Sequence, residues 1–190
     1  MNAWEQEIRE PTSWIAGILA ILIAFLGPSV LSPWSLLEPH KLGIVIGVLL
    51  GFIVHEFMHR NVARLYGLSS EFVAHIPGLV ITAVSALLPI RILTPGYVRV
   101  YGHSSRKGYA FSIAAGPLSN IIIALLGVLV SQSLNYPLRV IAIEVAEVNL
   151  WLAFFNLLPI PPLDGYKLAS LDLRLWLSLL MLLVFIWLLW

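Results

Sequence analysis

Long apolar runs alternate with short polar loops along the whole chain. Helices crossing a membrane are expected over residues 13–31, 42–60, 109–130, 148–164 and 173–190. Twenty residues of helix span about 30 Å, which is the thickness of the hydrocarbon core of a bilayer. Trp14 and Trp34 flank the first run, as aromatic residues do at the two membrane interfaces. The pattern predicts an all-α polytopic membrane protein.

One further apolar stretch, residues 76–93, does not follow this pattern. It contains Pro77, Gly78 and Pro89 and is rich in Val, Ile and Thr, so it is a poor helix candidate. It leads into residues 97–101, where apolar and polar positions alternate as in a strand. We expect a β-like hairpin here, and five to six transmembrane helices in all.

Composition agrees with a chain embedded in lipid. Of its 190 residues, 59% are hydrophobic and only 11% are charged, whereas soluble domains carry about a quarter charged residues. The net charge of +1 gives no reason to expect nucleic acid as a partner. With no cysteine, disulfides and thiol chemistry are excluded. No linker or repeat divides the chain, so we expect a single membrane domain over residues 1–190.

The second run contains the sequence His-Glu-Phe-Met-His. His55 and His59 are four residues apart, so on a helix they lie on one face, one turn apart. Two imidazoles at this spacing can bind one zinc ion, and Glu56 between them can accept a proton from the attacking water. The motif also arises by chance, but ionisable groups inside a membrane span cost about 2.5 kcal/mol or more each. Their presence favours a metal site over chance.

Zinc in a catalytic site needs a third protein ligand and an open position. Asp164 is the best candidate, since it follows an apolar helix broken by Pro159, Pro161 and Pro162. Broken helix at membrane depth is tolerated where it is packed in protein or lines a wet cavity. Pro-Leu-Asp-Gly is also ordinary turn chemistry, so a surface turn stays open as the alternative.

Three motifs occur in order: HEFMH at 55–59, AGPLSN at 115–120 and NLLPIPPLDG at 156–165. Together they resemble the site-2 protease family of intramembrane zinc metalloproteases, with a catalytic core over residues 42–170. The resemblance implies one zinc ion on His55, His59 and Asp164, with Glu56 as general base. It implies cleavage within transmembrane segments of membrane proteins. Asn156 matches a family asparagine associated with substrate or transition-state contact.

Depth along the second span indicates which side of the membrane the motif faces. If the span starts at Leu42, His55 lies about 20 Å in and about 10 Å from the other face. Arg60 and Arg64 then emerge at that face, which the positive-inside rule assigns to the cytoplasm. We therefore expect a multi-pass protein of the cell membrane with its active site towards the cytoplasm.

The remaining spans are consistent with this depth if the fourth span starts at Val148. Asp164 then lies about 24 Å along a helix, close to the depth of the histidines. If residues 72–93 crossed the membrane fully, Asp164 would open to the opposite side from His59 and could not share its metal. We expect this stretch to be re-entrant.

Three further residues are candidates for substrate contact. Gly116 and Asn120 lie on a run of small residues every four positions, near the expected depth of the metal. Such residues also serve close helix packing. Tyr97 belongs to the strand-like segment, which could pair with an unwound substrate or form only a structural hairpin.

The expected partners are a membrane-protein substrate helix and the lipid bilayer. No soluble regulatory domain is expected, and the oligomeric state is not indicated. Two other functions compete with the protease. A metal transporter would also place broken helices and carboxylates near the midplane, but paired repeats are lacking. A catalytically inactive relative that binds membrane proteins would not need Glu56.

Overall fold

The computed structural model describes residues 7–8 and 11–189, which are mostly helical. The α-helices are α1 (Thr12–Leu26), α2 (Pro39–Leu65), α3 (Ile76–Val84), α4 (Arg106–Ser131), α5 (Leu138–Leu157), α6 (Asp164–Leu171) and α7 (Leu173–Leu189). Short 3-10 helices are η1 (Gly27–Leu31), η2 (Pro33–Leu37) and η3 (Ser85–Leu87). The strands are β1 (Glu7–Ile8), β2 (Ser69–His75) and β3 (Gly96–Tyr101).

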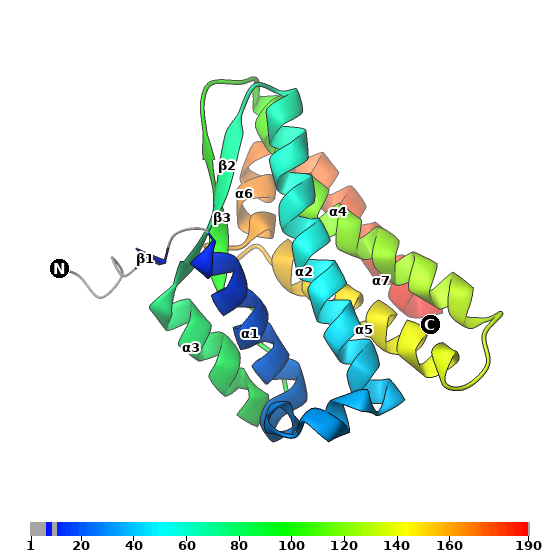
Figure 1. Cartoon of the computed structure of the whole chain (residues 1–190). Helices are drawn as coiled ribbons and strands as arrows, with labels where there is room; N and C mark the ends of the chain where they lie inside the picture. The colour runs from blue at the N-terminus through cyan, green and yellow to red at the C-terminus, as the bar shows by residue number, and fades with distance from the viewer. Residues whose placement is uncertain (1–6, 9–10, 190) are drawn as a thin grey trace.

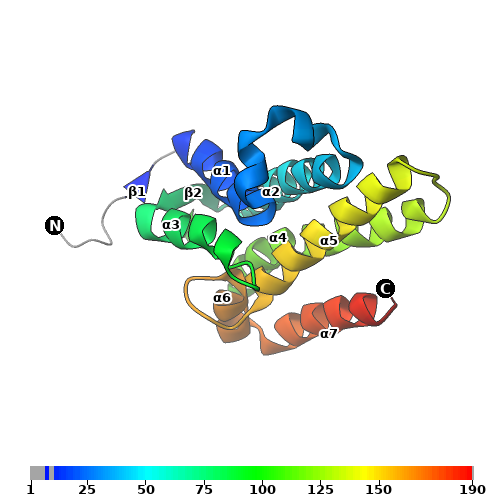
Figure 2. The same cartoon turned by 90° about the horizontal axis from the view of Figure 1, so that it is seen from below.

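Helices α2, α4 and α5 pack against one another and form the centre of the molecule (Figure 1). Helices α1 and α3 lie beside each other on one side of this group, below the sheet. Helices α6 and α7 lie on the other side, as the view from below also shows (Figure 2). The centre of the molecule is thus helix against helix, with the small sheet at one end.

The close packing of α2 against α5 depends on three glycines. A Cβ on Gly43 would lie 2.5 Å from Cβ of Glu144, and a Cβ on Gly47 would lie 3.0 Å from Cβ of Val148. On Gly51 it would lie 2.6 Å from Oδ1 of Asn149. Small residues four positions apart let membrane helices approach closely, so this stripe sets the distance between the two helices.

The described residues are mostly helical, as expected, and they also form a small antiparallel sheet in the order β1-β2-β3. The predicted strand at 97–101 is confirmed as β3, whose partner β2 pairs with it from Ser69 opposite Tyr101 to Ala74 opposite Gly96. Strand β2 was not predicted as a strand. An isolated strand is rarely stable, so a partner for β3 was to be expected.

The stretch 76–93 was expected to be a poor helix, and its first part is nevertheless helical as α3. Pro77 occupies the first turn, where a backbone N–H has no partner within the helix and proline is tolerated. Because β2 and β3 are paired, the segment between them leaves the sheet and returns to it. Its entry into the bilayer stays a prediction.

Within the described residues, four helices are long and apolar enough to cross a membrane, and they cover Thr12–Leu31, Pro39–Leu65, Arg106–Ser131 and Leu138–Leu157. Helix α7 is a shorter apolar helix of 17 residues. The five or six spans expected from the sequence therefore stay a prediction beyond these four. The fourth span does not start at Val148, since α5 begins ten residues earlier at Leu138.

Helix α5 also ends before Asp164 instead of continuing to it. Its last residue is Leu157, and Leu158 is extended because Pro159 follows. Helix α6 then starts at Asp164, and a Cβ on Gly165 would lie 2.6 Å from the carbonyl oxygen of Leu158. The glycine lets the first turn of α6 press against the end of α5, which brings Asp164 back towards α2.

Candidate metal centre

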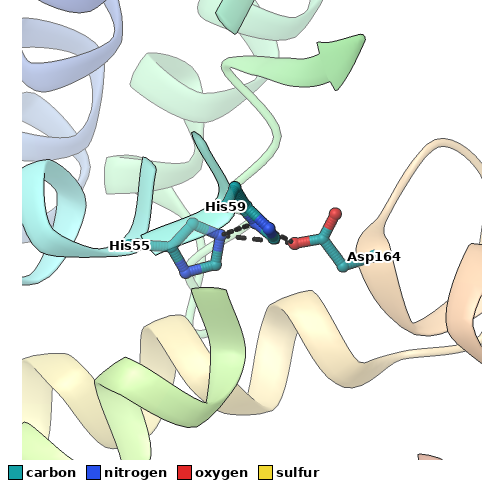
Figure 3. A group of neighbouring side chains, drawn as sticks. All are labelled: His55, His59 and Asp164. Carbon is teal, nitrogen blue, oxygen red and sulfur yellow. Dashed lines mark hydrogen bonds and ion pairs between the residues drawn. The ribbon is translucent and has the colours of Figure 1, made fainter. Parts of the chain in front are cut away.

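Two histidines of α2 and the first residue of α6 converge at one buried point (Figure 3). Nε2 of His59 lies 2.9 Å from Nε2 of His55 and 3.0 Å from Oδ2 of Asp164. Nε2 of His55 lies 3.3 Å from the same oxygen. Ligands held about 2.0–2.1 Å from a tetrahedral zinc ion are roughly 3.3 Å apart, so the three atoms have the spacing of a metal-binding triad.

The hydrogen-bond partners of Nδ1 in both histidine rings show that Nε2 is the nitrogen free to bind a metal. Nδ1 of His59 lies 2.7 Å from the carbonyl oxygen of Ser112, which can only accept a hydrogen bond. Nδ1 of His55 lies 2.6 Å from Oδ1 of Asn120. Each Nδ1 is therefore the donor, and each Nε2 directs its lone pair towards the other and towards Asp164.

Gly116 on α4 leaves the space in which these groups meet. A Cβ at this position would lie 2.7 Å from Nε2 of His55 and closer still to Nε2 of His59. Any side chain at 116 would displace the imidazoles. Gly116 was expected to contact substrate, and the structure places it directly against the two histidines.

A lysine approaches Asp164 from the side that points away from the histidines, and its positive charge favours the carboxylate form. Nζ of Lys167 lies 4.0 Å from Oδ1 of Asp164, the oxygen that does not face the histidines.

A cavity of about 40 Å³ opens beside the triad, with space for a water molecule or two. Glu56, Asn156 and Tyr97 all line it together with His55 and Asp164. The structure thus brings together, around one cavity, residues that the sequence identified from three separate segments. Asn156 is half-buried, and its Nδ2 donates to the carbonyl oxygen of Leu152 at 3.0 Å.

Asn120 is fully buried and also borders this cavity. Besides its contact with His55, it donates through Nδ2 to the carbonyl oxygen of Gly51 at 3.1 Å and to Oδ1 of Asn149 at 2.9 Å. Asn149 was not singled out from the sequence. The available signal was an amide side chain within an apolar span, where a polar group needs a partner.

The donor set fits a divalent metal ion such as zinc. Two imidazole lone pairs and one carboxylate oxygen face one another, and none of the three atoms brings a proton to the others. A cation at their centre would neutralise this clustering of acceptors, and neutral imidazole and carboxylate are common zinc ligands. In the part of the chain that the structure describes, this is the one group of three such side chains with ligand atoms within 4.8 Å of one another.

Comparison with known proteins supports the same chemistry. No protein-family model and no solved structure matches the chain. A protein of Methanocaldococcus jannaschii is 37% identical over 183 residues, which cover 93% of this chain and 91% of that protein. A protein of Bacillus subtilis is 31% identical over 151 residues, 67% of each chain. Both carry the name "Putative zinc metalloprotease", and neither name specifies the site-2 type. The chain belongs to the zinc metalloprotease family that includes these two proteins.

Proposed function

We propose that this protein is a site-2-type intramembrane protease, which hydrolyses peptide bonds within transmembrane segments of membrane proteins. The observation that carries the proposal is the position of the triad. His55 and His59 belong to α2, a helix long and apolar enough to span a membrane, and they are buried against α4, another such helix. A hydrolytic centre built between such helices suits a substrate that is itself in the bilayer.

Zinc bound to the triad would supply Lewis-acid activation of water and of the scissile carbonyl group. In the proposed mechanism Glu56 accepts a proton from the attacking water at its carboxylate and delivers it to the departing amine nitrogen. Glu56 is buried and lines the same cavity as Asp164, so its position suits this role.

Asn156 is proposed to hold the substrate carbonyl as charge develops on its oxygen. It borders the cavity, but its Nδ2 donates to Leu152 within its own helix, so the amide would turn towards the substrate on binding. Loss of one such donor lowers turnover about 10²–10³-fold in comparable sites. We expect Asn156→Ala to retain zinc and to lose turnover by this factor, as measured by peptide cleavage and metal content.

Strand β3 is the proposed binding edge for an unwound substrate. Among the described residues it pairs only with β2, and Tyr97 on it borders the cavity. Its outer edge is not fully open, since Nζ of Lys167 donates to the carbonyl oxygen of Val98 at 3.3 Å. An incoming strand would replace this contact and extend the sheet by one strand, next to Asp164.

The substitution Glu56→Gln tests the function. Glutamine is nearly isosteric and cannot accept the proton, so the variant is expected to retain its fold and its zinc and to lose cleavage by about 10²–10⁴-fold. Reconstituted vesicles containing a single-span membrane peptide would report cleavage, and metal analysis would report zinc. Glu144→Gln, a buried carboxylate distant from the triad, is the matched control and is expected to cleave normally.

Two outcomes would contradict this proposal. A Glu56→Gln variant that still cuts the peptide would exclude Glu56 as the base. Wild-type protein that carries zinc across the vesicle membrane and cuts no peptide would instead favour a metal transporter. The expected cut lies within the bilayer, about 10 Å from the face where Arg60 and Arg64 emerge.

The active site is proposed to face the cytoplasm of a cell-membrane protein. Arg60 and Arg64 lie in the second half of α2, beyond the histidines, and basic residues favour the cytoplasmic side. Because the chain has no cysteine, single cysteines at the exposed positions Ser32 and His103 can be labelled with an impermeant reagent. Position 32 is expected outside the cell and position 103 in the cytoplasm, so labelling of both from the same side would contradict this orientation.

A further inference from the structure

Asn149 lies 0% exposed in the middle of α5, where it faces both α2 and α4. Its Nδ2 donates to the carbonyl oxygen of Val145 at 2.8 Å and to that of Gly47 at 3.3 Å. Carbonyl oxygens only accept, so the NH₂ group must point at them and Oδ1 must point the other way. The orientation of the Asn149 amide is therefore set by two helix backbones.

The orientation of the Asn149 amide in turn fixes the orientation of the Asn120 amide. Oδ1 of Asn149 lies 2.9 Å from Nδ2 of Asn120, which also donates to the carbonyl oxygen of Gly51 at 3.1 Å. With both of its Nδ2 hydrogens used, Asn120 directs Oδ1 at Nδ1 of His55, 2.6 Å away. That contact requires the proton on Nδ1 and leaves the lone pair of Nε2 for the metal.

We propose that Asn149 is a positioning residue for the metal centre, acting through Asn120 to hold the His55 ring in the tautomer and orientation that bind zinc. The proposal rests on the zinc site of the proposed function. Asn149 touches neither the triad nor the cavity beside it, so it acts only by relay. Partners of this kind behind a metal-binding histidine typically change metal affinity by about 10–100-fold.

The competing explanation is that Asn149 only joins helices, since it bonds to α2 and α4 at once. The two explanations differ in how substitutions combine. If Asn149 acts through Asn120, its removal has no further effect on zinc once Asn120 is gone, whereas independent effects add. Leucine has the same number and branching of side-chain heavy atoms as asparagine and suits an apolar span, so Asn149→Leu and Asn120→Leu are the test variants.

The measurement is zinc affinity of the purified full chain by competition with a chelator, alongside thermal unfolding of the metal-free protein. We expect Asn149→Leu to weaken zinc binding about 10-fold. Asn120→Leu should weaken it at least as much, and the double variant no more than Asn120→Leu alone. Gly43→Ala is the control, because it disturbs the contact between α2 and α5 at a position two helical turns from Gly51. It should lower the unfolding temperature without changing zinc affinity.

Unchanged zinc affinity in Asn149→Leu, or effects that add fully in the double variant, would overturn the relay. If Asn149→Leu does not fold, Asn149→Ala is judged by the same criteria. Wild-type protein that binds no zinc would overturn both the relay and the proposed function. Wild-type protein that binds zinc tightly and cuts no membrane peptide would overturn the proposed function and leave the relay intact.

Discussion

Helix α2 carries histidine in its first turn and again in its second half, and the two places differ in what surrounds them. His40 lies 2.6 Å from a carboxylate of Glu144, but its side chain is 61% exposed. A cavity of about 290 Å³ beside this pair is also lined by Glu147 and Arg91. His55, by contrast, is buried, with both ring nitrogens engaged.

The difference shows that residue type alone does not make a metal site. Both places combine imidazole and carboxylate, yet only the second brings three ligand atoms within 4.8 Å among the described residues. There, a carbonyl and an amide fix the two outer nitrogens, and Gly116 removes the side chain that would separate the rings. Convergence comes from these partners, and it is absent around His40.

The largest expected effect comes from removing a ligand of the triad, with removal of His40 at the other end of α2 as the comparison. His59→Ala and Asp164→Ala should each reduce bound zinc to near zero, because two ligands and water hold the ion much more weakly than three. His40→Ala should leave zinc content at the wild-type level. Metal analysis of the purified proteins decides this, and equal zinc in Asp164→Ala and wild type would remove the assignment.

A smaller effect is expected from filling the space at Gly116. In Gly116→Ala the new methyl group would push the imidazoles apart, and a misplacement near 1 Å can cost about 10²-fold in turnover. Gly127→Ala is the matched control on the same helix. Its Cβ would also be crowded, at 2.9 Å from Cβ of Ala146, but against α5 and away from the metal.

The two variants are compared by zinc content and by cleavage of a membrane peptide. Both should lose some thermal stability, and only Gly116→Ala should lose turnover. Normal turnover in Gly116→Ala would show that the site tolerates the methyl group, and the proposed reason for this glycine would be wrong.

The smallest effect is expected at the His40 end. Glu144→Gln replaces a buried carboxylate by a nearly isosteric amide that can still hydrogen-bond to the largely exposed imidazole of His40. The unfolding temperature should therefore shift by no more than a few degrees, with zinc content unchanged. A large loss of stability in this variant would mean that the charge of Glu144 supports the fold and that the amide cannot replace it.

The triad could be predicted from the sequence because each of its ligands lies in a short segment with a recognisable pattern. The four-residue spacing of His55 and His59 needs only a helix, and the prolines before Asp164 already indicate a broken span. The break is confirmed, since α5 ends at Leu157 and α6 begins at Asp164. The expected start of this span at Val148 was wrong, because α5 begins at Leu138.

What the sequence did not reveal depends on contacts between distant segments. The partner of β3 is residues 69–75, and nothing local identifies them as a strand. Asn149 has a role only because α5 lies close enough to α2 and α4 for its amide to reach both. Pro77 and Gly78 argued against a helix, and only their position in its first turn makes α3 possible.

The separation of the ligands along the chain also sets when the site can exist during synthesis. Asp164 follows His59 by 105 residues, and a ribosome adds about 5–20 residues per second. The histidine pair is therefore made about 5–20 s before the carboxylate that completes the triad. During this interval α2 and α4 can enter the membrane without a hydrolytic centre between them. A nascent chain that has not reached Asp164 therefore lacks the third ligand of the metal centre.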